Sequence, residues 1–100
     1  MNEADRSDIQ AAIGGDGEAY ERLVRRYESQ ISRLMWRFSR DPGECEELVQ
    51  DVFVDAYFSL AGYREEAPFI HWLKRIAVRR GYRLWKEKKK QQRQVPLMDA

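Results

Sequence analysis

Residues 41–60 read DPGECEELVQDVFVDAYFSL, and this stretch decides the fold. Asp41 is a candidate N-cap, Pro42 suits the first helical position, and Glu44 stands three residues after the cap, as in a capping box. Apolar residues then recur with helical spacing: Cys45, Leu48, Val49, Val52, Phe53, Ala56, Tyr57 and Leu60. The pattern predicts one amphipathic helix, which Gly62 can close in a left-handed conformation.

The rest of the chain also has helical periodicity. We expect a short helix over about 5–13, which stops at Gly14, and a second over about 17–40, with Asp16 as its cap. A fourth begins near Pro68 and extends to about residue 92, with Gly81 inside it as a weak point or bend. No useful β-alternating run is present. The predicted fold is all-α, a compact bundle of three main helices plus a short N-terminal helix.

The charges divide along the chain. Residues 1–63 hold seven arginines against thirteen Asp and Glu, whereas residues 64–94 hold eleven Arg and Lys against three Glu. This split indicates an anionic partner for the C-terminal third and a different partner for the acidic part.

Cys45 is the single cysteine, and no segment resembles a signal peptide or a membrane span. We therefore expect a soluble, cytoplasmic chain in a reducing compartment.

The fourth predicted helix has two faces. Phe69, Leu73, Ile76, Ala77 and Leu84 share one side, with Trp72 at its border. A second side carries five cations: Arg75, Arg79, Lys86, Lys90 and Arg93. Such a stripe suits a phosphate backbone, and the neighbouring His71, Tyr82 and Trp85 can stack on unpaired bases. An acidic protein, a membrane surface or plain solvation are the alternatives.

The third predicted helix presents an acidic outer face. Glu44, Glu47, Gln50, Asp51 and Asp55 point toward solvent, and Leu48 and Val54 lie at the margins of that face. This mixture suits a basic partner helix, although an ordinary charged surface is the simpler interpretation. The sequence has no phosphate loop, metal-ligand cluster or nucleophile–base pair, so we expect no enzyme, cofactor or metal. Cys45 is interpreted as a buried hydrophobe.

Three blocks in order resemble a known family: ELVQDVFVDAY from Glu47, GYR from Gly62, and FIHWLKRIA from Phe69. They are similar to region 2 of bacterial sigma factors, most of all the extracytoplasmic-function (ECF) group of the sigma-70 family, and the upstream GGDGEAYERLVRRY also fits. The resemblance covers about 5–90. It implies that residues 1–94 form region 2, and that 95–100 begin a linker to a region 4 domain that this chain lacks.

The resemblance also implies site residues. The third helix would bind the β′ clamp coiled coil of core RNA polymerase through six residues: Glu47, Leu48, Gln50, Asp51, Val54 and Asp55. The fourth helix and its preceding loop would recognise and melt the promoter minus-ten element, largely as the single-stranded non-template strand. The DNA-binding residues would be Tyr63, Arg64, Trp72, Lys74, Arg75, Arg79, Arg80, Arg83 and Lys86. Four loop residues would form the pocket wall for a flipped base: Tyr63, Arg64, Glu65 and Glu66.

Some points stay open at this stage. Trp72 suits either a core anchor or a strand-separating wedge. Arg79 stands where the family commonly has asparagine, which exchanges a base-reading amide for a charge that prefers phosphate or guanine. Many relatives have an anti-sigma factor as a further partner, and the sequence does not say whether this chain has one. The rival functions are a small helical protein-interaction adaptor with a solvated basic helix, and a double-stranded DNA or RNA binder without a polymerase link.

Overall fold

The computed structural model describes the backbone of residues 2–94 and the side chains of residues 2–92. The helices are α1 (Glu3–Ile13), α2 (Gly17–Met35), α3 (Pro42–Ser59) and α4 (Phe69–Gln94), and a short 3₁₀ turn, η1 (Leu60–Gly62), follows α3. No strand occurs in the described range, so the all-α prediction is confirmed. The predicted linker, 95–100, lies outside the described residues.

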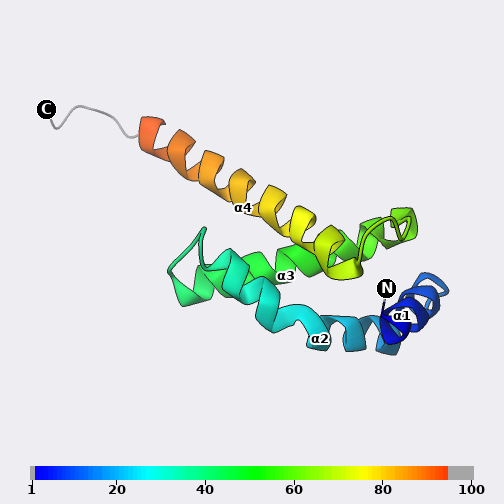
Figure 1. The fold of residues 1–100 in the computed structure, drawn as a ribbon. Coiled ribbons are helices and arrows are strands. Elements are labelled where there is room, and N and C mark those ends of the chain that lie inside the picture. The colour runs from blue at the N-terminus through cyan, green and yellow to red at the C-terminus, as the bar shows by residue number, and fades with distance from the viewer. Residues whose placement is uncertain (1, 95–100) are drawn as a thin grey trace, which may run out of the picture.

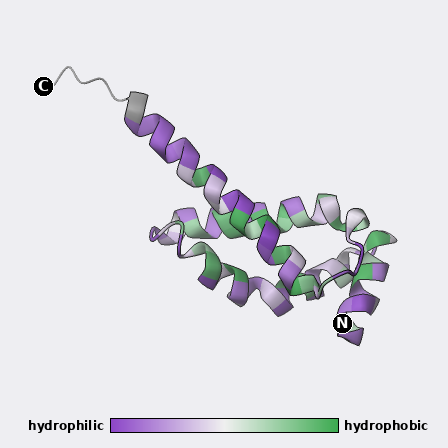
Figure 2. Cartoon of the chain, turned by 45° about the horizontal axis from the view of Figure 1, so that its top comes forward, coloured by the Kyte–Doolittle hydropathy of each residue, from purple (hydrophilic) through white to green (hydrophobic). Residues whose placement is uncertain are grey.

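The helices pack as an elongated bundle. α1 lies against α2, and α2, α3 and α4 contact one another pairwise. Figure 1 shows α4 passing across α3 and then projecting well beyond the other helices. The projecting half is strongly hydrophilic (Figure 2). This arrangement leaves the C-terminal part of α4 with neighbours on few sides.

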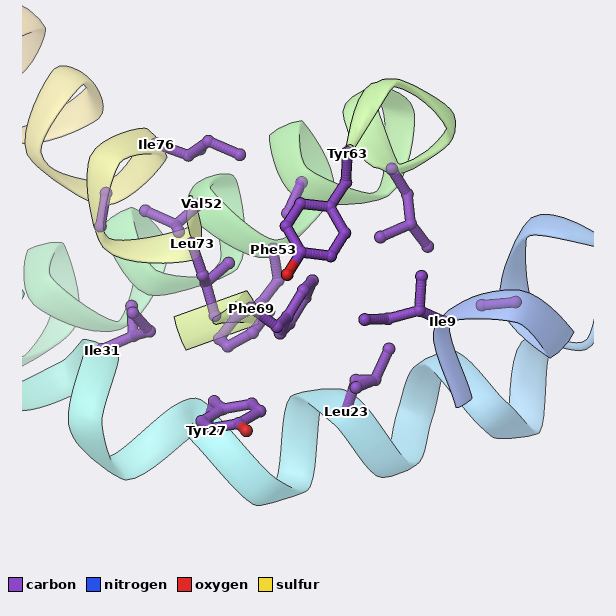
Figure 3. Close-up of a cluster of buried hydrophobic side chains, with 14 of the residues drawn as sticks. Ile9, Leu23, Tyr27, Ile31, Val52, Phe53, Tyr63, Phe69, Leu73 and Ile76 are labelled. Carbon is purple, nitrogen blue, oxygen red and sulfur yellow. The ribbon is translucent and has the colours of Figure 1, made fainter. Parts of the chain in front are cut away.

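One apolar core joins all four helices. The predicted stripes supply it: Ile9 from α1, Leu23 and Ile31 from α2, Val52 from α3, and Phe69 and Leu73 from α4. Each of these six side chains is at most 1% exposed, and they converge in Figure 3. Burial of large aliphatic and aromatic side chains contributes about 1.5–3 kcal/mol each. The core therefore fixes which face of each helix remains outside.

The helix starts follow the sequence closely. The side chains of Asn2, Asp16 and Asp41 cap α1, α2 and α3 by accepting backbone N–H groups of the first turn. Glu44 does not complete the expected capping box at α3. Its carboxylate instead accepts hydrogen bonds from Ser39 Oγ at 2.6 Å and from Lys88 Nζ at 2.5 Å. It thereby ties the start of α3 to the projecting half of α4.

Two helix ends differ from expectation. α2 ends at Met35 rather than near residue 40, because the backbone N–H groups of Arg37 and Phe38 bond to carbonyls three residues back and tighten the chain. α3 ends at Ser59, and Gly62 closes η1 without a positive φ. Tyr63 N–H bonds to Leu60 C=O at 3.0 Å, so a 3₁₀ turn replaces the predicted left-handed cap.

α4 continues through Gly81 without interruption. A Cβ at this position would lie 2.5–2.6 Å from three ring carbons of Phe38. The glycine therefore lets the Phe38 ring rest directly on the helix backbone where α2 and α4 cross. The close approach of the Phe38 ring accounts for a glycine at this position.

A polar network fastens α1 to α2. Asp5 and Asp8 are buried at 3% and 7% exposure. Arg26 donates to both carboxylates, with Nη2 to Asp8 Oδ2 at 2.7 Å, and Arg22 Nε donates to Asp8 Oδ1 at 3.0 Å. Tyr27 Oη donates to Asp5. Two charges are thus buried with partners, as burial of charged groups requires.

Candidate nucleic-acid interface

The basic stripe of α4 faces outward. Arg75, Arg79, Lys86 and Lys90 are all exposed, as is the adjacent Lys74. Within residues 2–92, none of these five forms an ion pair with a carboxylate. The side chain of Arg93 lies outside the described part. Unpaired cations aligned on one helix create a positive surface that favours an anionic, extended ligand.

The loop before α4 and the start of α4 enclose a small hollow. Its lining includes Arg64 and Glu66 from the loop and Trp72 and Arg75 from α4. The structure thus brings together several residues predicted from distant positions in the sequence. Glu65 does not line the hollow. It has φ 58° and its carboxylate lies 3.7 Å from Arg6 Nε, so it supports the loop from the α1 side.

Tyr63, predicted as part of a pocket wall, lines the hollow from a buried position. Its side chain is only 8% exposed. Its ring contacts Phe69 and Trp72 at centroid distances of 5.7 and 5.2 Å, and its hydroxyl donates to Ala67 C=O. Burial raises the pKa of the Tyr63 hydroxyl, which therefore stays protonated as a donor. Tyr63 forms the rigid base of the hollow rather than an exposed wall.

Trp72 lies at the boundary between the core and the hollow. It is half-buried, packs against the apolar core and contacts Phe69 at 5.5 Å between ring centroids. The contact is what the core-anchor interpretation predicts. One part of the ring still lines the hollow, so a base placed there would touch a ring that the core already immobilises.

Arg80 and Asp55 are paired with each other, which the sequence did not reveal. Arg80 Nε and Nη2 donate to the two Asp55 carboxylate oxygens at 2.8 and 2.9 Å. The hydrogen bonds that Arg80 donates to Asp55 raise the pKa of Arg80. The two residues had been predicted to bind DNA and polymerase, respectively. The geometry gives both an internal role, as a bidentate link between α3 and α4. Arg83 stays exposed one turn further along.

The acidic outer face of α3 is defined by Glu47, Gln50, Asp51 and Val54, all of which are exposed. Neither acid forms an ion pair within the described residues. The structure corrects the prediction for Leu48. This residue was expected at the margin of the acidic face, but its side chain is 4% exposed and belongs to the core. Leu48 cannot contact a partner without unpacking, because α3 turns this side chain toward the bundle.

Two features of the surface were missed. Phe58, at the end of α3, is 80% exposed, although Tyr57 beside it fits the apolar stripe and is itself 48% exposed. A second hollow lies where α2 crosses α4, lined by Leu34, Arg37, Phe38, Val78, Tyr82 and Trp85. Leu34 belongs to α2, Arg37 and Phe38 follow its end, and the other three belong to α4. Nothing in either helix alone shows that the two meet.

The structure also places the residues that metal, thiol or histidine chemistry would use. Among the described residues, no three His, Cys, Asp or Glu side chains gather as metal ligands. Cys45 is 6% exposed, and burial raises the pKa of its thiol, which disfavours the reactive thiolate.

His71 is exposed and lines a shallow hollow with Lys74, Arg75, Val78 and Arg79. None of the helices in the described range is both long and apolar enough to span a membrane.

Comparison with known proteins agrees with this geometry. The family model for sigma-70 region 2 matches residues 23–91. Similar curated proteins include the RNA polymerase sigma-H factor of Pseudomonas aeruginosa, 34% identical over 76 residues, and the ECF RNA polymerase sigma-E factor of Haemophilus influenzae, 36% identical over 75 residues. These alignments cover 76% and 74% of this chain, and 39% of each relative. The chain thus spans about two fifths of the length of these relatives.

A solved structure is also similar. It is an NMR structure of an engineered region 2 of sigmaE in complex with GTAAAA, which matches with a TM-score of 0.80 and 28% sequence identity. The match covers 91% of this chain and 97% of the other. The helical fold, the order of the motifs and the family match lead to one conclusion: the chain belongs to the sigma-70 region 2 family, with sigma factors of the ECF group among its relatives.

Proposed function

We propose that this chain is the part of an alternative sigma factor that binds core RNA polymerase through α3 and reads the promoter minus-ten element through α4. The observation that carries the proposal is the separation of unpaired charge. Arg75, Arg79 and Lys86 face outward on α4, whereas Glu47 and Asp51 face outward on α3. Region 2 of sigmaE in complex with GTAAAA supports a nucleic-acid ligand for this fold.

On α4, the expected ligand is an opened single strand. The hollow formed by Arg64, Trp72 and Arg75 is floored by a fixed aromatic cluster and offers cations on its rim. Extruding a base into such a pocket costs a few kcal/mol of unstacking, which stacking and phosphate contacts must offset. The exposed stripe beyond the hollow would then follow the phosphates by counterion release.

On α3, the expected ligand is the β′ clamp coiled coil. Glu47 and Asp51 would meet arginines or lysines of that coiled coil, and Gln50 and Val54 would add a hydrogen bond and apolar packing. Charge complementarity of this kind speeds and orients association more than it adds affinity. Leu48 and Asp55 are left out of this proposed contact, because one is buried and the other is paired with Arg80.

The DNA half is tested by fluorescence anisotropy with a labelled, randomised single-stranded 20-mer and with its duplex form, over a range of salt concentrations. The variant Arg75→Ala with Arg79→Ala is expected to weaken single-strand binding at least tenfold and to reduce the salt slope by roughly 1.4, about 0.7 per lost phosphate contact. Arg25→Ala with Arg33→Ala removes the same charge from exposed positions of α2 and serves as the matched control.

The polymerase half is tested by capture with an isolated β′ coiled-coil fragment. Gln50→Ala with Asp51→Ala should abolish capture, whereas Glu18→Ala with Glu21→Ala, on the exposed surface of α2, should leave it intact. Equal binding of duplex and single strand, with no capture, would support a general nucleic-acid binder instead. Capture without any DNA binding would support the adaptor.

A further inference from the structure

The hollow at the crossing of α2 and α4 combines aromatic rings with positive charge. Tyr82 and Trp85 are 51% and 50% exposed, and both line the hollow together with Phe38 and Arg37. No acidic residue lines it. Half-exposed tryptophan and tyrosine beside cations are the groups that hold unpaired bases without regard to sequence.

The rings are already positioned by the fold. Phe38 sits against the backbone at Gly81, and its ring meets Tyr82 edge-on at a centroid distance of 5.4 Å. The ring centroids of Tyr82 and Trp85 are in turn 6.3 Å apart. The Lys89 ammonium stands 4.5 Å from the Trp85 ring centroid. The aromatic surface is therefore positioned by Phe38, which follows the end of α2, and the Lys89 cation lies beside it.

This hollow is continuous with the proposed minus-ten surface. Val78 lines both the crossing hollow and the shallow hollow that contains His71, Lys74 and Arg75. Trp85 lies ten positions after Arg75 in α4, and this step corresponds to about 15 Å along an α-helix. At duplex spacing that distance corresponds to four or five nucleotides of one strand. A strand leaving the first site therefore reaches the second within a few nucleotides.

We propose that the α2–α4 crossing is a second single-strand site. In it, Trp85 and Tyr82 stack on a base outside the minus-ten element, and Arg37 and Lys89 neutralise the flanking phosphates. The inference rests on the proposed function, because the same strand must occupy the first site. It assigns a role to the exposed rings of Tyr82 and Trp85, which are not part of the buried core.

The test compares three single-stranded probes: GTAAAA, and GTAAAA extended by six thymidines on its 5′ side or on its 3′ side. Wild type is expected to bind one of the extended probes about tenfold more tightly than the hexamer, the gain from stacking of about one base. Trp85→Ala should remove that gain while changing hexamer affinity less than twofold. Trp85→Phe should retain most of it.

Phe58→Ala is the matched control, because it deletes an exposed aromatic from another helix and should keep the gain. Circular dichroism confirms that each variant is folded. The inference is overturned if neither extension tightens binding, or if the gain survives in Trp85→Ala. If wild type binds none of these probes but still binds the randomised pool, the inference fails and the proposed function stands. Failure to bind any single strand overturns both.

Discussion

Gly81 shows how one residue can carry a tertiary contact. Glycine inside a helix costs about 1 kcal/mol relative to alanine, yet this one allows the Phe38 ring to lie against the α4 backbone. An added methyl group would overlap three ring carbons and displace Phe38 from its contact with Tyr82. The packing loss should exceed the gain in helix propensity.

We therefore predict that Gly81→Ala lowers the free energy of unfolding by about 1–2 kcal/mol, within the range for overpacking a close contact. Urea denaturation measures the change. Gly17→Ala is the control, because a Cβ there would meet nothing within 4 Å. A Gly81→Ala variant as stable as wild type would show that Phe38 moves aside without cost.

At the scale of elements, α1 is attached to α2 through charge as well as apolar packing. Burial alone raises the pKa of Asp8, but hydrogen bonds and charge from Arg26 and Arg22 outweigh it and hold the pKa below its usual value. A carboxyl group whose pKa is lower in the folded state stabilises the fold above its unfolded pKa. That stabilisation disappears as the pH falls through the folded pKa.

Asp8→Asn should therefore lower the free energy of unfolding by about 1–3 kcal/mol at pH 7, because Arg22 and Arg26 lose a charged acceptor. The deficit should shrink progressively below about pH 4, where wild type loses the same charge. Chemical denaturation at a series of pH values measures both curves. A deficit that is constant from pH 7 to pH 3 would show that the carboxylate charge contributes nothing.

The helices themselves were predictable because their signals are local. Caps at Asp16 and Asp41 and the apolar stripes lie within one or two turns of sequence, so periodicity located all four helices and most of the core. The exposed cations of α4 followed from the same pattern. The predictions that failed concern contacts between helices, because these contacts depend on how one helix is rotated against another.

Three sets of contacts illustrate that limit. Asp55 and Arg80 are 25 positions apart, and their pairing depends on the packing of α3 against α4. Lys88 reaches Glu44 over 44 positions for the same reason. Tyr63 was predicted to contact DNA from the loop, but the loop folds back so that its ring joins Phe69 and Trp72. No local pattern records such contacts.

At the scale of the whole molecule, the charges of the sequence become two surfaces. The internal pairs, Asp55 with Arg80 and Glu44 with Lys88, neutralise charges between α3 and α4. The remaining acids of α3 and cations of α4 form no ion pairs among the described residues, and most of them are exposed. A body of this kind can hold a basic protein and an anionic strand at once, and this is the central claim of the account.

The most direct test is the affinity of the chain for a labelled single strand, measured without and then with a saturating concentration of the β′ coiled-coil fragment. The account predicts a three-component complex, seen as a further rise in anisotropy, with the affinity for the strand no weaker than in the fragment's absence. Displacement of the strand by the fragment would contradict it, since the two partners would then be competing for one surface.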